Sequence, residues 1–181
     1  MKPAIALWMA AGACLWAQNP PAPTVGRVYD SQLNSTEREV VSLAEAMPAN
    51  KFSFHPSDGA FAQVRTFAQQ IKHIAAVNYL VAAAVLQEKP PVDLGKGEDG
   101  PESIQSRDAV VAFLKDSFVY AHKAMLSLTD KNQLDMIEGP FGNNKSARGG
   151  LAMVAIWHPF DHYGQMVIYA RMNGVIPPAS R

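Results

Sequence analysis

The sequence predicts an all-α protein, built as a bundle of four helices. Four long segments, residues 25–47, 60–86, 107–128 and 150–172, carry apolar side chains at helical spacing. The stretches between them are rich in proline, glycine, asparagine and aspartate, which form turns. Helices connected in this way pack around a core of inward-facing side chains.

Composition limits the classes of function. The 181 residues suffice for one domain with a core, and 48% hydrophobic with 18% charged residues indicates a folded rather than a disordered chain. Sixteen basic residues balance sixteen acidic ones, and neither sign forms a long run. Nucleic-acid binding through phosphate contacts needs a basic face, so we expect no nucleic-acid partner.

The N-terminus has the pattern of a secretory leader. Lys2 precedes an uncharged apolar run over residues 4–17, and a proline-rich stretch follows. The run is shorter than the ~20 residues that span a bilayer. We therefore predict a signal peptide over residues 1–17, a proline-rich linker over 18–29, and an exported protein, periplasmic or extracellular, without a membrane span in the mature chain.

The single cysteine, Cys14, lies inside this leader. The mature chain would then have no disulfide, no cysteine nucleophile and no cysteine metal ligand. Two alternatives are weaker. In a lipoprotein Cys14 would be lipidated, but Ala11 stands where leucine is usual. A buried N-terminal helix would be separated from the rest by the prolines that follow.

The first helix is predicted from the amphipathic pattern of residues 25–47, with Ser35 or Thr36 as candidate N-caps and Pro48 as its end. The bundle domain is accordingly assigned to residues 30–178. The next stretch, residues 49–59, reads as a loop, and its His55 is expected to be a solvated or locally bonded loop residue.

The second helix is predicted over residues 60–86, which contain no proline or glycine. Beyond Ala75 it is apolar nearly all round, which indicates burial on more than one side. His73 lies off the apolar stripe of the first half, so we expect a neighbouring helix to enclose it partly.

A loop over residues 88–106 is longer than most connections and would either cover a site or cross the end of the bundle. The third helix follows over residues 107–128, and its His122 is expected to be a surface or hydrogen-bonded residue. Residues 129–150 are turn-rich, with room for a short strand at 134–137.

The fourth helix, residues 150–172, contains the pair on which the functional argument depends. His158 and His162 are four residues apart, so on a helix both imidazoles face one spot. Such a pair belongs either to a metal site, which needs a third ligand from elsewhere, or to a hydrogen-bonded core. The expected core of the bundle includes Leu80, Phe113, Leu114, Phe118 and Ile168.

Three stretches together resemble the DinB-like family of four-helix metalloproteins, also called YfiT-like. They are HIAAVNYL at 73–80, HPFDHYGQ at 158–165 and YARMNGVIPP at 169–178. The resemblance covers residues 30–178 and implies an up-down-down-up bundle with long crossing loops. It also implies a divalent metal, zinc or nickel, bound by His73, His158 and His162.

The sequence departs from the family pattern around these residues. Pro159 follows the first histidine of the pair and removes a helical hydrogen bond, so we expect a kink. Tyr163 stands where many relatives have histidine or arginine. Asp161 would either orient a ligand or be an ordinary surface charge. Gln165, Asn78 and Tyr163 are further candidates for contacts around the metal or with a substrate. The alternative for Gln165 and Asn78 is ordinary polar packing.

Three histidines leave a metal position open, as in catalytic zinc sites. We therefore expect an enzyme, a transferase or hydrolase, whose metal activates a low-molecular-weight thiol or water. The resemblance suggests thiols such as bacillithiol or mycothiol, but these are cytosolic and the leader argues against them. The alternatives are a non-catalytic exported metal- or ligand-binding bundle and a purely structural one. The expected partner is a small-molecule substrate; a homodimer is left open.

Overall fold

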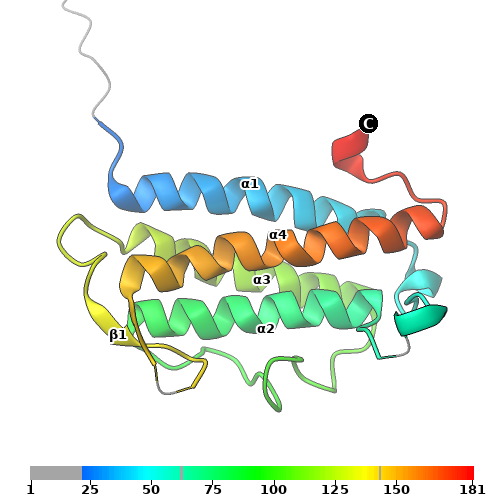
Figure 1. The fold of residues 1–181 in the computed structure, drawn as a ribbon, viewed down its shortest axis with the longest axis horizontal. Helices are drawn as coiled ribbons and strands as arrows, with labels where there is room; N and C mark the ends of the chain where they lie inside the picture. The colour runs from blue at the N-terminus through cyan, green and yellow to red at the C-terminus, as the bar shows by residue number, and fades with distance from the viewer. Residues whose placement is uncertain (1–21, 62, 143) are drawn as a thin grey trace, which may run out of the picture.

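Four helices lie side by side in the computed structural model, which describes residues 22–61, 63–142 and 144–181 (Figure 1). They are α1 (Val25–Ala46), α2 (Phe67–Leu86), α3 (Arg107–Leu126) and α4 (Arg148–Met172). The predicted signal peptide and the start of the linker fall outside the described residues. Within the described part, no helix combines the length and apolar character that crossing a membrane requires.

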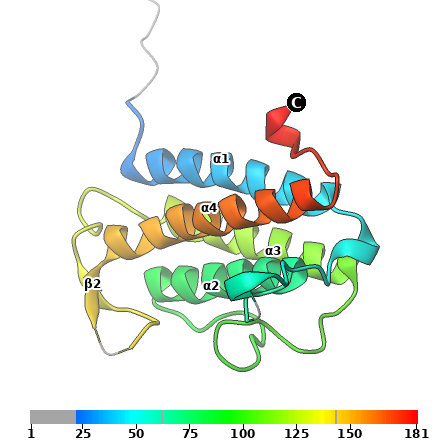
Figure 2. The ribbon, with the colours of Figure 1, turned by 45° about the vertical axis from the view of Figure 1, so that its right-hand side comes forward.

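The helix directions give the up-down-down-up order that was expected. α1 and α4 run one way along the bundle, and α2 and α3 run the other way (Figures 1 and 2). α2 packs on α3 and α4, and α1 packs on the same two helices, so α1 and α2 are diagonal. Because α2 and α3 are parallel, the connection between them must return along the whole bundle, which accounts for its length (Figure 1).

The core runs along the centre of the bundle, and α2 is buried on nearly every side. Its alanines let α3 and α4 approach closely, while larger side chains fill the space between the helices. Fully buried large residues include Leu33, Phe67, Ile71, Ile74, Leu114, Phe118 and Met166. Burying one such side chain contributes ~1.5–3 kcal/mol to folding. The bundle is thus held by packing along its whole length.

The predicted core is right on α3 and wrong on α4. Phe113, Leu114 and Phe118 are buried, whereas Leu80 is only half-buried. Ile168 is 54% exposed, because α4 also carries large apolar side chains on its outward face.

The N-cap of the first helix is Thr24, eleven residues before Ser35, the first of the two predicted caps. The Thr24 hydroxyl accepts a hydrogen bond from the Arg27 backbone N–H at 3.3 Å, as an N-cap does. Ser35 and Thr36 therefore lie inside α1, where the Thr36 hydroxyl donates to the Gln32 carbonyl at 3.2 Å. The predicted boundary between the linker and the bundle domain, at residues 29 and 30, falls within this helix.

The second helix begins at Phe67 and not at residue 60. Thr66 and Gln69 form a reciprocal capping box: the Gln69 N–H donates to the Thr66 hydroxyl at 3.2 Å, and the Thr66 N–H donates to Gln69 Oε1 at 2.8 Å. Among the described residues of the predicted first turns, Gly59–Phe61 forms a short 3₁₀ turn. This start places His73 in the second turn of α2.

A small hairpin precedes the fourth helix. β1 (Met136–Glu138) pairs antiparallel with β2 (Lys145–Ala147); β1 overlaps the predicted strand, and β2 was not predicted. The N–H groups of Arg148 and Gly149 then donate to the carbonyls of Asp135 and Gln133, at 2.9 and 2.8 Å. These bonds fix the start of α4 and hence the position of the histidine pair along the bundle.

Candidate metal centre

Three histidines from two helices meet between α2 and α4. The Nε2 atom of His158 lies 3.1 Å from Nε2 of His73 and 3.1 Å from Nε2 of His162. One nitrogen from each ring can be chosen so that all three lie within 4.8 Å of one another. His73 and His162 are buried, and His158 is partly buried. The structure thus brings together the three residues that the resemblance indicated.

The fourth helix places its two histidines on one face despite the proline between them. α4 is continuous from Arg148 to Met172, with Pro159 buried inside it (Figure 1). A proline in a helix interior costs ~3 kcal/mol through the lost hydrogen bond and crowding. The expected kink does not interrupt the helix, so the one-turn spacing of His158 and His162 is kept.

Hydrogen bonding determines which nitrogen of His73 is free. Its Nδ1 lies 2.8 Å from the carbonyl oxygen of Glu98, which can only accept, so Nδ1 carries the proton. The neutral ring then has a lone pair on Nε2, directed at the other two histidines. A single imidazole nitrogen has either a proton or a lone pair, so Nε2 of His158 cannot form hydrogen bonds with both of its neighbours. A cation that accepts three lone pairs accounts for this convergence.

Burial keeps the three rings neutral. Desolvation, with smaller contributions from the neighbouring histidines and Arg65, lowers the pKa of His158 to about 3. Desolvation also lowers the pKa of His162 to about 4 and lowers the pKa of His73, with Arg65 contributing to both. Neutral imidazole is the form that binds metals, so at pH 7 the centre needs no deprotonation.

The donor set fits a borderline divalent ion. Nitrogen ligands at about 2.0–2.1 Å around a tetrahedral ion are separated by ~3.3 Å, close to the two 3.1 Å separations found here. Three imidazoles suit zinc, nickel or a similar ion better than magnesium or calcium, which prefer oxygen. Only His73 has its second ring nitrogen hydrogen-bonded; among the described residues Nδ1 of His158 and of His162 has no partner. The three rings could therefore hold a divalent metal ion and leave a position open.

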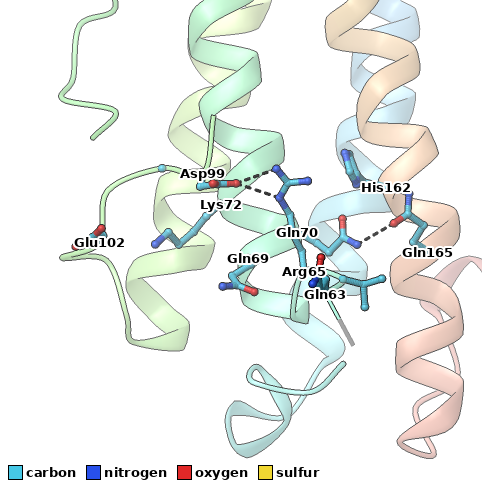
Figure 3. A pocket seen from close by; sticks show the side chains of 11 residues that line it. Gln63, Arg65, Gln69, Gln70, Lys72, Asp99, Glu102, His162 and Gln165 are labelled. Atoms are coloured by element: carbon cyan, nitrogen blue, oxygen red, sulfur yellow. Dashed lines mark hydrogen bonds and ion pairs between the residues drawn. The ribbon is translucent and has the colours of Figure 1, made fainter. Parts of the chain in front are cut away.

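Two pockets lie on either side of the centre. A polar, open pocket of about 760 Å³ includes His162 in its wall (Figure 3). In it the Arg65 guanidinium pairs with Asp99, at 3.0 Å from Nε and 2.9 Å from a terminal nitrogen. Its other polar side chains include Gln63, Gln69, Gln70, Lys72, Glu102 and Gln165. A smaller pocket of about 290 Å³ has an apolar wall that includes Trp157 and Phe141, and it reaches His158.

Two of the other predicted site residues lie beside the polar pocket. Gln165 lines it, accepts a hydrogen bond from Gln70 at 2.9 Å and donates to Asp161 at 3.2 Å. Asp161 therefore orients Gln165 and not a histidine. Gln70 was not predicted, although its place one turn before His73 on the same helix is a signal that could have identified it.

The remaining two candidates point elsewhere. Asn78 donates to the Ser117 hydroxyl at 3.2 Å, between α2 and α3. The Tyr163 hydroxyl donates to Glu39 at 3.1 Å, between α4 and α1, and burial together with this carboxylate raises the pKa of Tyr163. Both residues join helices, and neither lines the two pockets beside the centre.

The other two histidines are outside the centre, as expected. His55 stays in its loop, with Nδ1 2.8 Å from the Pro56 carbonyl oxygen. His122 on α3 lies between two carboxylates of α1, with Nδ1 2.6 Å from Asp30 and Nε2 2.9 Å from Glu37.

A family model described as the DinB superfamily matches residues 32–166. The chain belongs to the DinB superfamily. The fold agrees with this assignment, because solved DinB-like proteins share it. One from Bacillus cereus has a TM-score of 0.65 at 14% identity, covering 83% of this chain and 93% of that one. One from Bacillus subtilis has a TM-score of 0.60 at 18% identity, covering 81% and 92%.

A conserved protein from Enterococcus faecalis is similar to the same extent, with a TM-score of 0.65 at 15% identity and coverage of 83% and 98%. At these identities the likeness concerns the fold alone. No protein of curated function matches the sequence.

Proposed function

We propose that this DinB superfamily protein is a metal-dependent enzyme, of transferase or hydrolase type, that acts on a small molecule. His73, His158 and His162 would hold a divalent ion, zinc or nickel. The observation that carries the proposal is the convergence of three imidazole Nε2 atoms from two helices. Nε2 of His158 lies 3.1 Å from Nε2 of each of the other two, and Glu98 sets the tautomer of His73.

The chemistry follows from the open position. A divalent ion bound by three neutral imidazoles supplies Lewis acidity that lowers the pKa of a thiol or water in its remaining position. The chain's own part is to hold the three rings neutral by burial, to fix His73 through Glu98, and to place a polar pocket against His162. That pocket is open and polar, which favours an enzyme over a non-catalytic binding protein.

The pocket supports a polar substrate. Its wall carries the cations Arg65 and Lys72 and the carboxylates Asp99 and Glu102, so the charges balance. A molecule that has both donors and acceptors suits such a wall better than a strongly charged one. Water as the nucleophile fits an exported protein; a thiol would have to be available in the same compartment.

The experiment compares the protein loaded with zinc or nickel with the same protein after chelation. Two reactions are followed: conjugation of a small thiol to a chromogenic electrophile, and hydrolysis of a nitrophenyl ester. We expect one of the two to depend on the added metal and on His162. His55→Ala should leave it unchanged, since His55 contacts its own loop and does not belong to the histidine cluster. If the metal-loaded protein, the chelated protein and His162→Ala gave equal rates in both reactions, the proposed enzymatic activity would be contradicted.

A further inference from the structure

Gln70, which lines the polar pocket, carries a buried hydrogen-bond acceptor that the described residues leave unpaired. Gln70 is only 2% exposed, and its Oε1 has no hydrogen-bond partner among the described residues. A buried polar atom without a partner is destabilising, and such atoms in native proteins call for an explanation. Because Oε1 is buried, the donor that satisfies it is either an ordered water or a molecule held in the site.

A chain of three side chains fixes which atom of Gln70 is left free. The Asp161 carboxylate can only accept, so the amino group of Gln165 faces it, at 3.2 Å. The oxygen of Gln165 therefore faces Gln70, which must donate through Nε2, at 2.9 Å. The free atom of Gln70 is then Oε1, an acceptor.

The two amides lie one turn away from the metal centre on both helices. Gln70 precedes His73 by three residues, and Gln165 follows His162 by three. Because α2 and α4 run in opposite directions, both steps lead the same way along the bundle, by ~4.5 Å at the rise of an α-helix. Figure 3 shows the Gln70–Gln165 bond joining α2 to α4 next to His162.

We propose that Gln70 Oε1 accepts a hydrogen bond from the molecule held at the open position of the centre. The site would then take ligands that carry an N–H or O–H group on the side facing Gln70. A carboxylate there would put two acceptors against each other and bind more weakly. The inference rests on the proposed metal site and specifies the class of ligand that this site takes.

Imidazole and 1-methylimidazole are matched probes for this acceptor. Both offer the same kind of ring nitrogen to a metal, but only imidazole keeps an N–H. In protein loaded with cobalt(II), the visible absorption spectrum reports the binding of either probe. We expect wild type to prefer imidazole by about tenfold, as one hydrogen bond to a buried acceptor allows.

The variants distinguish the acceptor from the rest of the pocket. Gln70→Met, which keeps the length of the side chain but removes the oxygen, should abolish most of the preference and leave the affinity for 1-methylimidazole unchanged. Gln63→Met makes the same change at an exposed residue of the same pocket and should keep the full preference. Circular dichroism checks that each variant is folded.

The outcomes separate this inference from the proposed function. No cobalt bound by wild type would overturn both. If both wild type and folded Gln70→Met bind cobalt stoichiometrically and show the same preference for imidazole over 1-methylimidazole, the inference alone is overturned. If Gln70→Met does not fold, the exposed Gln165→Met decides, because it removes only the group that orients Gln70. A reduced preference in that variant supports the inference, and an unchanged preference overturns it.

Discussion

The imidazole Nδ1 of His73 donates a hydrogen bond of 2.8 Å to the carbonyl oxygen of Glu98. His73 is on α2, and Glu98 is in the long loop that returns the chain to the start of α3. Two roles were open for this loop from the sequence, covering a site or crossing the bundle. It contributes to the site, because its backbone sets the tautomer of a candidate metal ligand, and it runs along the bundle instead of crossing its end.

Gly100 lets the loop approach α2 and α3 closely, and we predict that Gly100→Ala weakens metal binding. Gly100 has φ +70°, and an added Cβ would lie 3.3 Å from the Lys72 carbonyl oxygen and from the Phe113 ring. The loop must shift, and loss of a hydrogen bond that orients a ligand typically weakens metal binding by about 10–100-fold. Gly59→Ala is the control for backbone strain alone: its φ is +65° and nothing lies within 4 Å. Equal zinc affinities of the two variants in a competition titration would contradict this role of the loop.

The stability contributed by His122 is predicted to depend on pH. Burial disfavours the charged ring, but hydrogen bonds to Glu37 and Asp30 outweigh it and raise the pKa of His122 above 6.5. The folded state thus binds the proton more tightly than the unfolded state does. This contribution is therefore fully present below pH 6.5 and is lost as the pH rises through the folded pKa.

Urea denaturation of metal-free wild type and His122→Gln at pH 5.5 and pH 9 tests this. The difference in free energy of unfolding should be on the order of 1 kcal/mol at the lower pH, since the pair is partly exposed and screened, and should shrink at the higher pH. A difference that is the same at both values would show that His122 contributes through packing alone.

Two helical glycines are predicted to respond to alanine with opposite signs. Gly26 at the start of α1 packs on the end of α3, and an added Cβ would lie 2.9 Å from the carbonyl oxygens of Met125 and Leu128. Gly26→Ala must move backbone and should destabilise the protein by about 1–3 kcal/mol. Gly164 on α4 has nothing within 4 Å, so Gly164→Ala should stabilise by about 0.5–1 kcal/mol. Thermal melting of both variants provides the comparison, and a stabilised Gly26→Ala would contradict the packing of α1 on α3.

Export is predicted from the leader alone. Protein purified from the native cells should lack residues 1–17, and fractionation should place it outside the cytoplasm. A functional form that keeps Met1 or Lys2 would contradict this prediction, and a lipid on Cys14 would favour the lipoprotein alternative.

The sequence was sufficient for the helices but not for all of their ends. Helical spacing located the four segments, but it did not identify the N-caps of α1 and α2, which are the single hydroxyl groups of Thr24 and Thr66. The Thr66–Gln69 capping box was visible in the sequence and would have corrected the start of α2.

The centre was predictable in part, for a similar reason. The spacing of His158 and His162 is local, so one helix turn predicts that they share a face. His73 joins them only through the packing of α2 on α4. Periodicity alone does not predict this packing, so His73 was assigned from the family resemblance. The role of Gln70 depends on the same packing, because its partner Gln165 is 95 residues away in the sequence.

Metal content of the histidine variants tests the central claim most directly. Wild type, His158→Ala and the control His55→Ala are dialysed against zinc, and bound metal is measured together with circular dichroism. We expect one zinc per chain in wild type and in His55→Ala, and almost none in His158→Ala, because two imidazoles cannot hold the ion as three do. The helical signal should persist in all three, since packing and not metal holds the bundle together. An equal zinc content in His158→Ala and wild type would contradict the proposed three-histidine metal site.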